Sequence, residues 1–353
     1  MAGTFIKLYN VDAEPASAFF LNEGRIFFYA STADKYAISG KNLIVGATEI
    51  IMREKLGTDA LRVETAVAEG GSSLKKMAPE KIIQGLKNYS ISLNVSMVIA
   101  RQVLLSNNII NANISLLEGD EKKTRELSIE FYAAVERIRS EYDKRKLPWL
   151  KELLKTHETN LTYKRGEAFS KSAEPVKITA TKNLADKLVE YERGDVICEE
   201  DTTGNEMFIL ESGAIDVLLK GNKVATIEDS GTVFGEMALL LGEKRTATLK
   251  AKNNVVVTRI KKEDLRYVAE KQQEVLESIA MALAKRHYYN IVKIRSINRS
   301  LVESSLKEEE EGKKPSQLEK TRKDFALFKR ELSAAVKGKE ASFLEDLLSD
   351  DDA

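Results

Sequence analysis

The chain has 353 residues, which is long for one ordinary domain and suits two, and its 43% hydrophobic content is enough for a substantial core. Its 55 basic and 55 acidic residues balance, which argues against non-specific nucleic-acid binding because that binding depends on excess positive charge. The single cysteine, Cys198, excludes an internal disulfide. Neither a secretory signal nor a run of about 18 apolar residues is found, so we expect a cytoplasmic protein.

The first 75 residues are rich in β-branched and aromatic side chains, with turn residues between the runs. Such runs favour short strands. We expect strands at Phe5–Tyr9, Ala18–Leu21, Arg25–Ala30 and Tyr36–Ile38. From Glu80 onward the apolar residues recur every three or four positions, which predicts helices.

Further along the chain this succession of strands and helices is repeated. Pro148 interrupts a long helical block, and a second strand-rich region runs from Val196 to Ile260. Helical spacing of the apolar residues resumes at Lys262. The acidic run Glu308–Glu311 indicates a charged break, and the end of the chain from Leu344 to Ala353 is acidic.

The two strand-rich regions are related by an internal repeat with an offset of 189 residues. The identical pairs are Gly24 and Gly213, Gly46 and Gly235, Phe19 and Phe208, Leu21 and Leu210, Ile26 and Ile215, and Ile38 and Ile227. After Gly46 the offset falls to 183, which aligns Arg62 with Arg245 and indicates six extra residues in the first copy. The pattern predicts a duplicated domain.

The most informative segment runs from Phe234 to Thr248. A strand ends near Val233, Gly235 lets the backbone turn sharply, and the first amides of the following helix can bind an anion. Arg245 can supply a forked cation for phosphate oxygens. Glu236 is unusual beside an anion, but its carboxylate can accept a sugar hydroxyl. The combination indicates a ribose joined to a phosphate.

This segment resembles the phosphate-binding cassette of the cyclic nucleotide-binding domain family. The matching residues are Phe234, Gly235, Glu236, Met237, Ala238, Leu239, Arg245, Ala247 and Thr248. The run from Gly194 to Gly213 is similar to the family's first strands, so the resemblance covers roughly residues 188–265, and the following helices suit its hinge and lid. The resemblance implies a jelly-roll-like β-barrel that takes cAMP or cGMP as its ligand, without a metal.

The resemblance also implies roles for individual residues. Glu236 is expected to accept the ribose 2′-hydroxyl, and Arg245 to bind the cyclic phosphate with help from backbone amides of the cassette. Thr246 can reach the base or the phosphate, and threonine is common there in members that accept guanine, which leaves both nucleotides open. The expected ligand-binding residues are Val233, Phe234, Gly235, Glu236, Met237, Ala238, Arg245, Thr246 and Ala247.

The first copy departs from this pattern. Ala47 stands where Glu236 stands in the second copy, so the ribose acceptor is missing. Glu49 brings a negative charge toward the phosphate position, and the extra residues are expected to displace Arg62. We interpret the first copy as a degenerate relative that kept the barrel and lost the ligand, with packing, dimerisation or support of the sensor as its use.

Other candidates for chemistry are few. His157 and His287 lie far apart without a cysteine at metal-ligand spacing, so we expect them to be solvated or core residues. Cys198 falls in an expected strand and is interpreted as a small buried side chain. Tyr288 or Tyr289 could stack on a purine as a lid, but plain helix packing is favoured. With no nucleophile–base pair in view, we expect a non-enzymatic protein.

The predicted fold is α+β, with two jelly-roll-like β-barrels of cyclic nucleotide-binding type, flanking helices and a helical linker. Four segments are expected: a degenerate barrel with helices at 1–115, a helical linker at 116–180, a cyclic nucleotide-binding domain with lid helices at 181–305, and a charged helical tail at 306–353.

The expected function is a regulatory cyclic nucleotide sensor in signal transduction, in which ligand binding moves C-terminal helices. A catabolite-activator-type transcription regulator is one alternative, although the basic helix around Lys320–Arg330 lacks the turn of a helix-turn-helix. A degenerate scaffold that binds only protein is another, against which the intact Glu236 and Arg245 argue. The expected partners are the nucleotide and an unidentified protein, with neither nucleic acid nor membrane, and a homodimer is left open.

Overall fold

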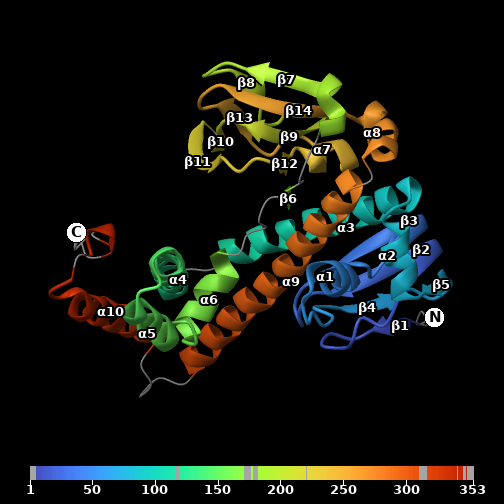
Figure 1. The fold of residues 1–353 in the computed structure, drawn as a ribbon. Helices are drawn as coiled ribbons and strands as arrows, with labels where there is room; N and C mark the ends of the chain where they lie inside the picture. Colours follow the sequence, from blue (N-terminus) through green and yellow to red (C-terminus); the bar gives the residue numbers. More distant parts are fainter. Residues whose placement is uncertain are drawn as a thin grey trace. The chain divides into compact units, whose positions relative to one another are not determined.

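The structure is a computed structural model that describes residues 5–116, 119–170, 176–177, 182–219, 221–272, 274–309, 316–339, 341–344 and 347. Figure 1 traces the chain, in which runs of antiparallel strands are followed by runs of helices, as in an α+β fold. The chain divides into two compact units. The first contains residues 1–108 and 173–291, and the second contains residues 109–172 and 292–353.

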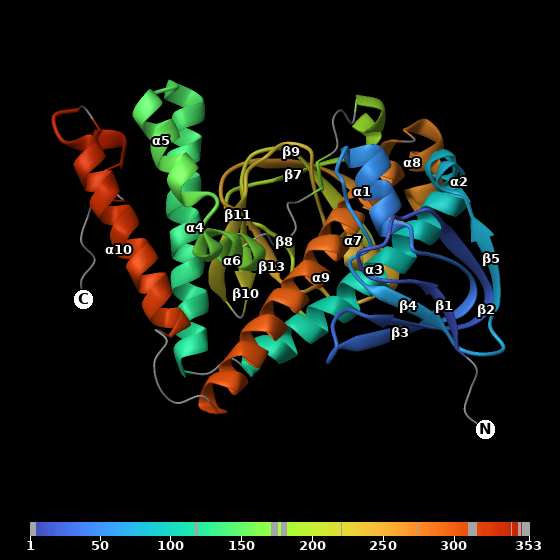
Figure 2. The same cartoon turned by 90° about the horizontal axis from the view of Figure 1, so that it is seen from below.

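The first strand-rich region is one antiparallel sheet in the first unit. Its strands are β1 (Ile6–Tyr9), β2 (Ala18–Tyr29), β3 (Lys35–Val45), β4 (Thr65–Ala68) and β5 (Ser73–Met77), with helix α1 (Thr48–Leu56) between β3 and β4. The strand order is β1-β4-β2-β3, and β5 pairs with a separate part of β2. Figure 2 shows β2 and β3 as a long curved hairpin in blue.

Strand β2 changes its partner at Gly24. The half that begins at Ala18 pairs with β5, and the half from Ile26 onward pairs with β4. Gly24 has a φ of 140°, and a Cβ at this position would overlap Ser72, so only glycine fits. This glycine allows one strand to serve two neighbours on the same edge.

The sequence-based prediction of separate strands at Ala18–Leu21 and Arg25–Ala30 was wrong. Pairing with β3 continues through Gly24, which keeps β2 a single strand of 12 residues. For the same reason the short strand predicted at Tyr36–Ile38 extends over all 11 residues of β3. The local turn signals were overridden by the long hairpin.

The second strand-rich region forms two antiparallel sheets in the first unit. Its elements are β6 (Val176–Lys177), the 3₁₀ helix η1 (Lys182–Lys187), β7 (Leu188–Tyr191), β8 (Val196–Cys198), β9 (Glu206–Ser212), β10 (Ile215–Leu219), β11 (Asn222–Ile227), β12 (Thr232–Phe234), α7 (Glu236–Leu241), β13 (Thr248–Ala251) and β14 (Val255–Lys261). The sheet orders are β11-β10-β13-β8 and β6-β12-β9-β14-β7. A shared core contains Phe208, Leu210, Ile215 and Val257.

The strands of the two regions pair in the same register. The matching pairs are Phe19 with Val45 and Phe208 with Phe234, Ile26 with Ile38 and Ile215 with Ile227, and Leu21 with Leu74 and Leu210 with Val257. Equivalent residues of the two repeats are 189 positions apart when they precede α1 and α7, and 183 positions apart when they follow these helices. This is the six-residue difference that the sequence predicted. The predicted repeat is therefore matched by hydrogen-bonded strand pairing.

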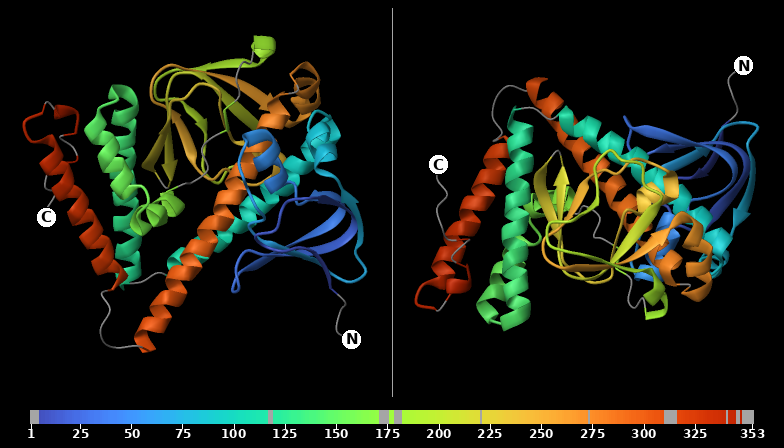
Figure 3. Two further views of the ribbon diagram at one scale, coloured as in Figure 1. Left: turned by 60° about the horizontal axis from the view of Figure 1, so that its bottom comes forward. Right: turned by 90° about the horizontal axis from the view of Figure 1, so that it is seen from above.

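Helices complete the first unit. They are α2 (Pro79–Gly85), the 3₁₀ helix η2 (Lys262–Asp264), α8 (Leu265–Lys271), and the first parts of α3 (Tyr89–Ser115) and α9 (Glu274–Glu309). Apolar residues of α3, such as Ile99 and Val103, share one buried cluster with Ile279 and Leu283 of α9. Both helices can be followed in the two views of Figure 3.

The second unit is helical. Besides the ends of α3 and α9, it contains α4 (Gly119–Arg145), α5 (Pro148–His157), α6 (Leu161–Ser170), α10 (Gln317–Val336) and the 3₁₀ helix η3 (Ser342–Leu344). Its core includes Phe131 and Phe328. His157 lies edge-on to both rings, with its Nε2 at 2.9 Å from a Glu331 carboxylate oxygen, so it is the core histidine that one of the two sequence-based readings expected.

The two units differ in layout from the four consecutive segments expected from the sequence, because each unit joins two separate stretches of chain. The predicted boundaries between segments stay predictions. The basic helix predicted around Lys320–Arg330 is part of α10. The charged break at Glu308–Glu311 lies partly, and the acidic end from Leu344 to Ala353 lies mostly, outside the described residues.

Candidate functional site

The predicted cassette lies where strand β12 ends and the chain turns into helix α7. Gly235 forms this turn with a φ of 78°, a left-handed value that favours glycine. A Cβ at Gly235 would also collide with the side chain of Arg245. The segment thus folds into a strand, a glycine turn and a six-residue helix whose first amides face away from the helix body.

Arg245 is held firmly beside this turn. Its guanidinium donates to the carbonyl oxygen of Gly235 at 3.1 Å and to that of Glu206 at 2.8 Å. The side chain is 6% exposed and lies over the ring of Phe208, 5.6 Å from its centroid. These contacts fix a cation next to the start of α7, where the amides and the helix dipole also favour an anion.

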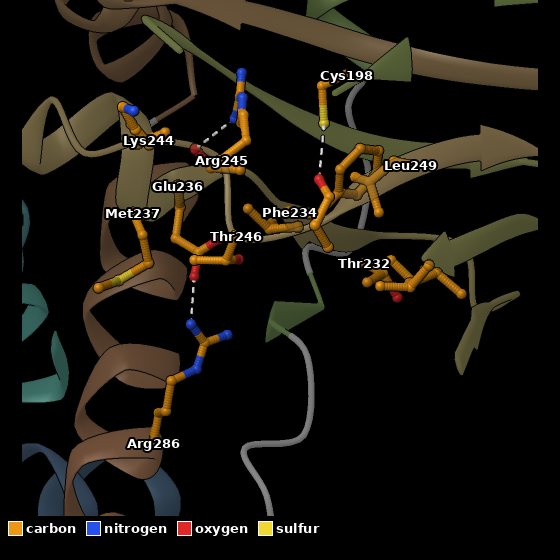
Figure 4. Close-up of a pocket in the computed structure, with 16 residues that line it drawn as sticks. Cys198, Thr232, Phe234, Glu236, Met237, Lys244, Arg245, Thr246, Leu249 and Arg286 are labelled. Carbon is orange, nitrogen blue, oxygen red and sulfur yellow. Dashed lines mark hydrogen bonds and ion pairs between the residues drawn. The ribbon is translucent and has the colours of Figure 1, made fainter. Parts of the chain in front are cut away.

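A cavity of about 250 Å³ opens at the cassette. All nine ligand-binding residues predicted from the sequence line it: Val233, Phe234, Gly235, Glu236, Met237, Ala238, Arg245, Thr246 and Ala247. The other lining residues are Cys198, Val217, Ile227, Thr232, Lys244, Leu249 and Arg286. The cavity therefore combines charged groups with apolar side chains from strands β10, β11 and β13, as Figure 4 shows in part.

Glu236 is buried at this cavity and ion-paired. It is 3% exposed, and its carboxylate accepts a hydrogen bond from the guanidinium of Arg286 at 2.6 Å. Figure 4 shows Arg286 reaching from α9 toward Glu236. In this structure the predicted ribose acceptor is therefore engaged by a cation of the same chain.

Sequence reasoning missed Arg286. The apolar stripe of α9 includes Ile279 and Leu283, and position 286 follows Leu283 by three residues, which places it on a neighbouring part of the helix face. This spacing could have singled out Arg286. Which element that face meets depends on how α9 packs against α7, and no local pattern sets this packing.

Three other predicted features take definite places. Thr246 is exposed at the rim of the cavity, and its predicted influence on base preference stays a prediction. Cys198 is half-buried, and burial raises the pKa of its thiol. Tyr288 and Tyr289 contact each other edge-on at 5.6 Å and are not among the residues that line the cavity, so the geometry gives no support to a purine lid.

The prediction that extra residues displace Arg62 in the first repeat was wrong. Arg62 donates to the carbonyl oxygens of Gly46 at 2.9 Å and Ser17 at 2.5 Å, which are the counterparts of the two carbonyls that hold Arg245. Helix α1 has nine residues where α7 has six, so the helix and the turn behind it absorb the insertion. The predicted negative charge is present, since Glu49 contacts Arg62 at 2.6 Å.

Among the described residues, no group of three or more His, Cys, Asp or Glu side chains is arranged to hold a metal ion. No helix in the described part of the chain combines the length and the apolar character needed to cross a bilayer.

A glycine turn, a fixed arginine and a buried carboxylate thus meet at one cavity, and the first two are suited to an anion such as phosphate. Residues 188–272 match the family model of the cyclic nucleotide-binding domain. This part of the chain is thus a cyclic nucleotide-binding domain of that family, as its sequence resemblance implied.

Curated proteins are similar over a shorter stretch. The potassium/sodium hyperpolarization-activated cyclic nucleotide-gated channel 2 of Mus musculus is 41% identical over 61 residues, which is 17% of this chain and 7% of the channel. Channel 4 of Oryctolagus cuniculus is also 41% identical over 61 residues, or 5% of that channel. The chain thus spans a small fraction of the length of these relatives.

Solved structures show weak overall likeness. One described as cAMP-bound PfPKA-R is 15% identical with a TM-score of 0.25, covering 79% of this chain and 79% of that one. A putative cyclic nucleotide-binding protein from Geobacter metallireducens is 24% identical with a TM-score of 0.23, covering 29% of this chain and 77% of that one.

Proposed function

We propose that this chain is a non-enzymatic sensor that binds cAMP or cGMP in the cavity of its second repeat. The observation that carries the proposal is the position of Arg245 and Glu236, which line one cavity inside the segment matched to the cyclic nucleotide-binding domain. A cyclic nucleotide presents a single phosphate charge next to a free 2′-hydroxyl. A fixed guanidinium and a buried carboxylate at the same cavity complement these two groups.

The proposed pose follows from the chemistry of the cavity walls. The cyclic phosphate is placed against Arg245 and the first amides of α7. The ribose hydroxyl donates to Glu236. The base then lies along the apolar side chains of Val217, Ile227 and Leu249, where ring burial is favourable.

Signal transmission is proposed to begin at the Glu236–Arg286 pair. A ribose hydroxyl that donates to Glu236 competes with the Arg286 guanidinium for the same carboxylate. Ligand binding therefore favours states in which Arg286 leaves Glu236 and α9 shifts with it. Glu236 is buried, Arg286 is partly buried, and α9 is one continuous helix of 36 residues, so a displacement of Arg286 can be passed along this helix.

The finer parts of the picture belong to the same proposal. Both repeats are taken as jelly-roll-like β-barrels of cyclic nucleotide-binding type, with the first one degenerate and the second one functional. The sensor is proposed to be cytoplasmic and to signal to a protein partner rather than to nucleic acid. The balanced charge of the chain supports a protein partner over nucleic acid, and the shared strand register supports the likeness of the two repeats.

Isothermal titration calorimetry of the full chain with cAMP and with cGMP tests the proposal directly. Arg245→Ala should weaken binding by about 1.5–3 kcal/mol, the usual worth of a charge-assisted hydrogen bond, which is roughly 10–150-fold. Arg266→Ala is the matched control, because Arg266 is exposed on α8 and outside the cavity. No binding of either nucleotide, or equal affinity in the Arg245 variant, would defeat the assignment and favour a protein-binding scaffold.

A further inference from the structure

The first repeat keeps the frame of a nucleotide pocket but fills it with its own side chains. At the offsets set by strand pairing, Phe28 stands where Val217 lines the second cavity, and Glu64 stands where Ala247 lines it. Tyr36 follows as the cross-strand partner of Phe28, and their rings stack at 5.1 Å. All three of these first-repeat side chains are buried. Larger residues therefore occupy the volume that the second repeat leaves open.

The phosphate position of the first repeat holds a carboxylate. Glu49 Oε2 accepts from the Arg62 guanidinium at 2.6 Å, and Glu49 Oε1 accepts from the backbone amide of Val63 at 3.3 Å. Arg62 and Val63 are the counterparts of Arg245 and Thr246. Glu49 and Arg62 are each 1% exposed. An anion of the chain thus takes the donors that would otherwise meet a phosphate.

Helix α9 supplies a ring to the same site. His287 is fully buried, with Nε2 at 2.9 Å from the Tyr36 hydroxyl and Nδ1 at 3.0 Å from the Thr48 hydroxyl at the start of α1. The Tyr36 hydroxyl also lies 2.8 Å from Glu64 and accepts from Gln102 of α3 at 3.1 Å. The imidazole ring of His287, which belongs to α9, therefore lies between helix α1 and strand β3 of the first repeat.

This network is suited to permanent contact at neutral pH. Burial lowers the pKa of His287 to about 3, and burial followed by the charge of Glu49 raises the pKa of Glu64 well above its usual range. His287 is therefore uncharged near neutrality, and the shift of Glu64 favours its uncharged form. The Glu49–Arg62 ion pair lies in the same network, and its two charges compensate each other.

We infer that the first repeat is a docking site for helix α9, occupied by the chain itself, with Glu49 in place of a phosphate and His287 in place of a ligand ring. The repeat has thereby exchanged a diffusible ligand for a segment of its own chain. Its hydrogen-bonding groups are retained and form hydrogen bonds with residues of α1, α3 and α9.

The docking also has a consequence for the second repeat, and this step rests on the proposed function. Neighbouring residues of an α-helix point about 100° apart, so adjacent side chains can address different surfaces. Arg286 reaches Glu236 of the second repeat, while His287 is buried in the first. Anchoring His287 therefore positions Arg286 at the ligand cavity.

Chemical rescue of Glu49→Ala tests the docking site without any nucleotide. The substitution removes a fragment the size of acetate, and acetamide matches its shape without its charge. All variants also carry Arg245→Ala, so that anions cannot act on the second cassette. At equal ionic strength we expect acetate, and not acetamide, to raise the Tm of the Glu49→Ala chain by about 2–4 °C, with no difference for the parent. An equal response to both additives would overturn the inference.

Amide hydrogen exchange of the His287→Ala chain tests the docking of α9 independently. It is the deciding experiment if the Glu49→Ala chain shows no cooperative melting transition. We expect exchange in α1 (Thr48–Leu56) to speed up at least about tenfold, because the ring that bonds Thr48 is gone. Exchange in β14 of the second repeat should not change, and Tyr289→Ala on the same helix is the control. Unchanged exchange in α1 would refute docking, whatever the nucleotide-binding result.

Discussion

Arg286 offers the sharpest test of the proposed sensor, because it competes with the ligand for Glu236. In the structure its guanidinium donates to the Glu236 carboxylate at 2.6 Å. A nucleotide that uses Glu236 must break this bond before its ribose hydroxyl can replace it. Arg286→Ala removes the competitor and leaves the acceptor in place, so we expect the variant to bind cyclic nucleotide more tightly than the wild type.

The size of the effect can be estimated from the burial of the pair. A hydrogen bond to a charged group is worth about 1.5–3 kcal/mol when water is excluded. The Arg286 side chain is 22% exposed, so water recovers part of this value. We therefore expect a gain of about 1 kcal/mol, which is roughly a fivefold lower Kd. The ligand-free variant should also melt at a lower temperature, since Glu236 is 3% exposed and loses its partner.

Calorimetric titration of both variants with cAMP and cGMP measures this change. Arg295→Ala is the matched control, because it is the same substitution on the same helix at an exposed position. Weaker binding by Arg286→Ala would refute the reasoning and assign Arg286 to the ligand site as a direct contact. Unchanged binding would show that Glu236 is not the group that the nucleotide uses.

Three further predictions concern stoichiometry, base preference and pH. Because Glu49 and His287 occupy the first repeat, titration should give one nucleotide per chain, and a second site that survives Arg245→Ala would contradict this. Thr246→Ala should cost cGMP about 0.5–1.5 kcal/mol more than cAMP, since guanine carries an exocyclic amine that the hydroxyl can accept, and an equal loss in competition binding would remove the argument for guanine. The folded chain keeps a proton on Glu64 that the unfolded chain has released above about pH 4.3, so stability should fall as pH rises. Glu64→Gln should flatten that fall in thermal melts recorded at increasing pH above about 4.3, and an unchanged slope would count against it.

The sequence was sufficient for the features that are set by a few neighbouring residues. The strand, glycine turn and short helix around Gly235 follow from local chemistry, and the nine residues predicted from this motif all line the cavity. The internal repeat was also visible, because the glycines and core residues that fix strand register recur at a constant offset. In both cases the pattern and the physical constraint lie within the same short stretch.

The features that were missed depend on distant parts of the chain. Arg286 and His287 are adjacent polar residues in a helix, and nothing around them shows that one pairs with α7 and the other enters the first repeat. The position of Arg62 was judged from its spacing to Gly46, although its two carbonyl partners are fixed by β2 and β3. The continuous strand β2 was divided at Gly24 because a glycine beside polar residues resembles a turn until its partner strand is known.

The longer helix α1 shows how two similar repeats can differ in the spacing of their motif residues. Gly46 and Arg62 are 16 residues apart, whereas Gly235 and Arg245 are 10 apart, yet both arginines donate to the preceding glycine carbonyl. The extra residues in helix α1 and in the turn after it thus leave the contact between the arginine and the glycine carbonyl unchanged. A one-residue slip between paired strands, in contrast, turns every side chain to the opposite face of the sheet. The likeness of the two repeats is consequently clearest in the pairing of their strands, while the distances between their motif residues differ.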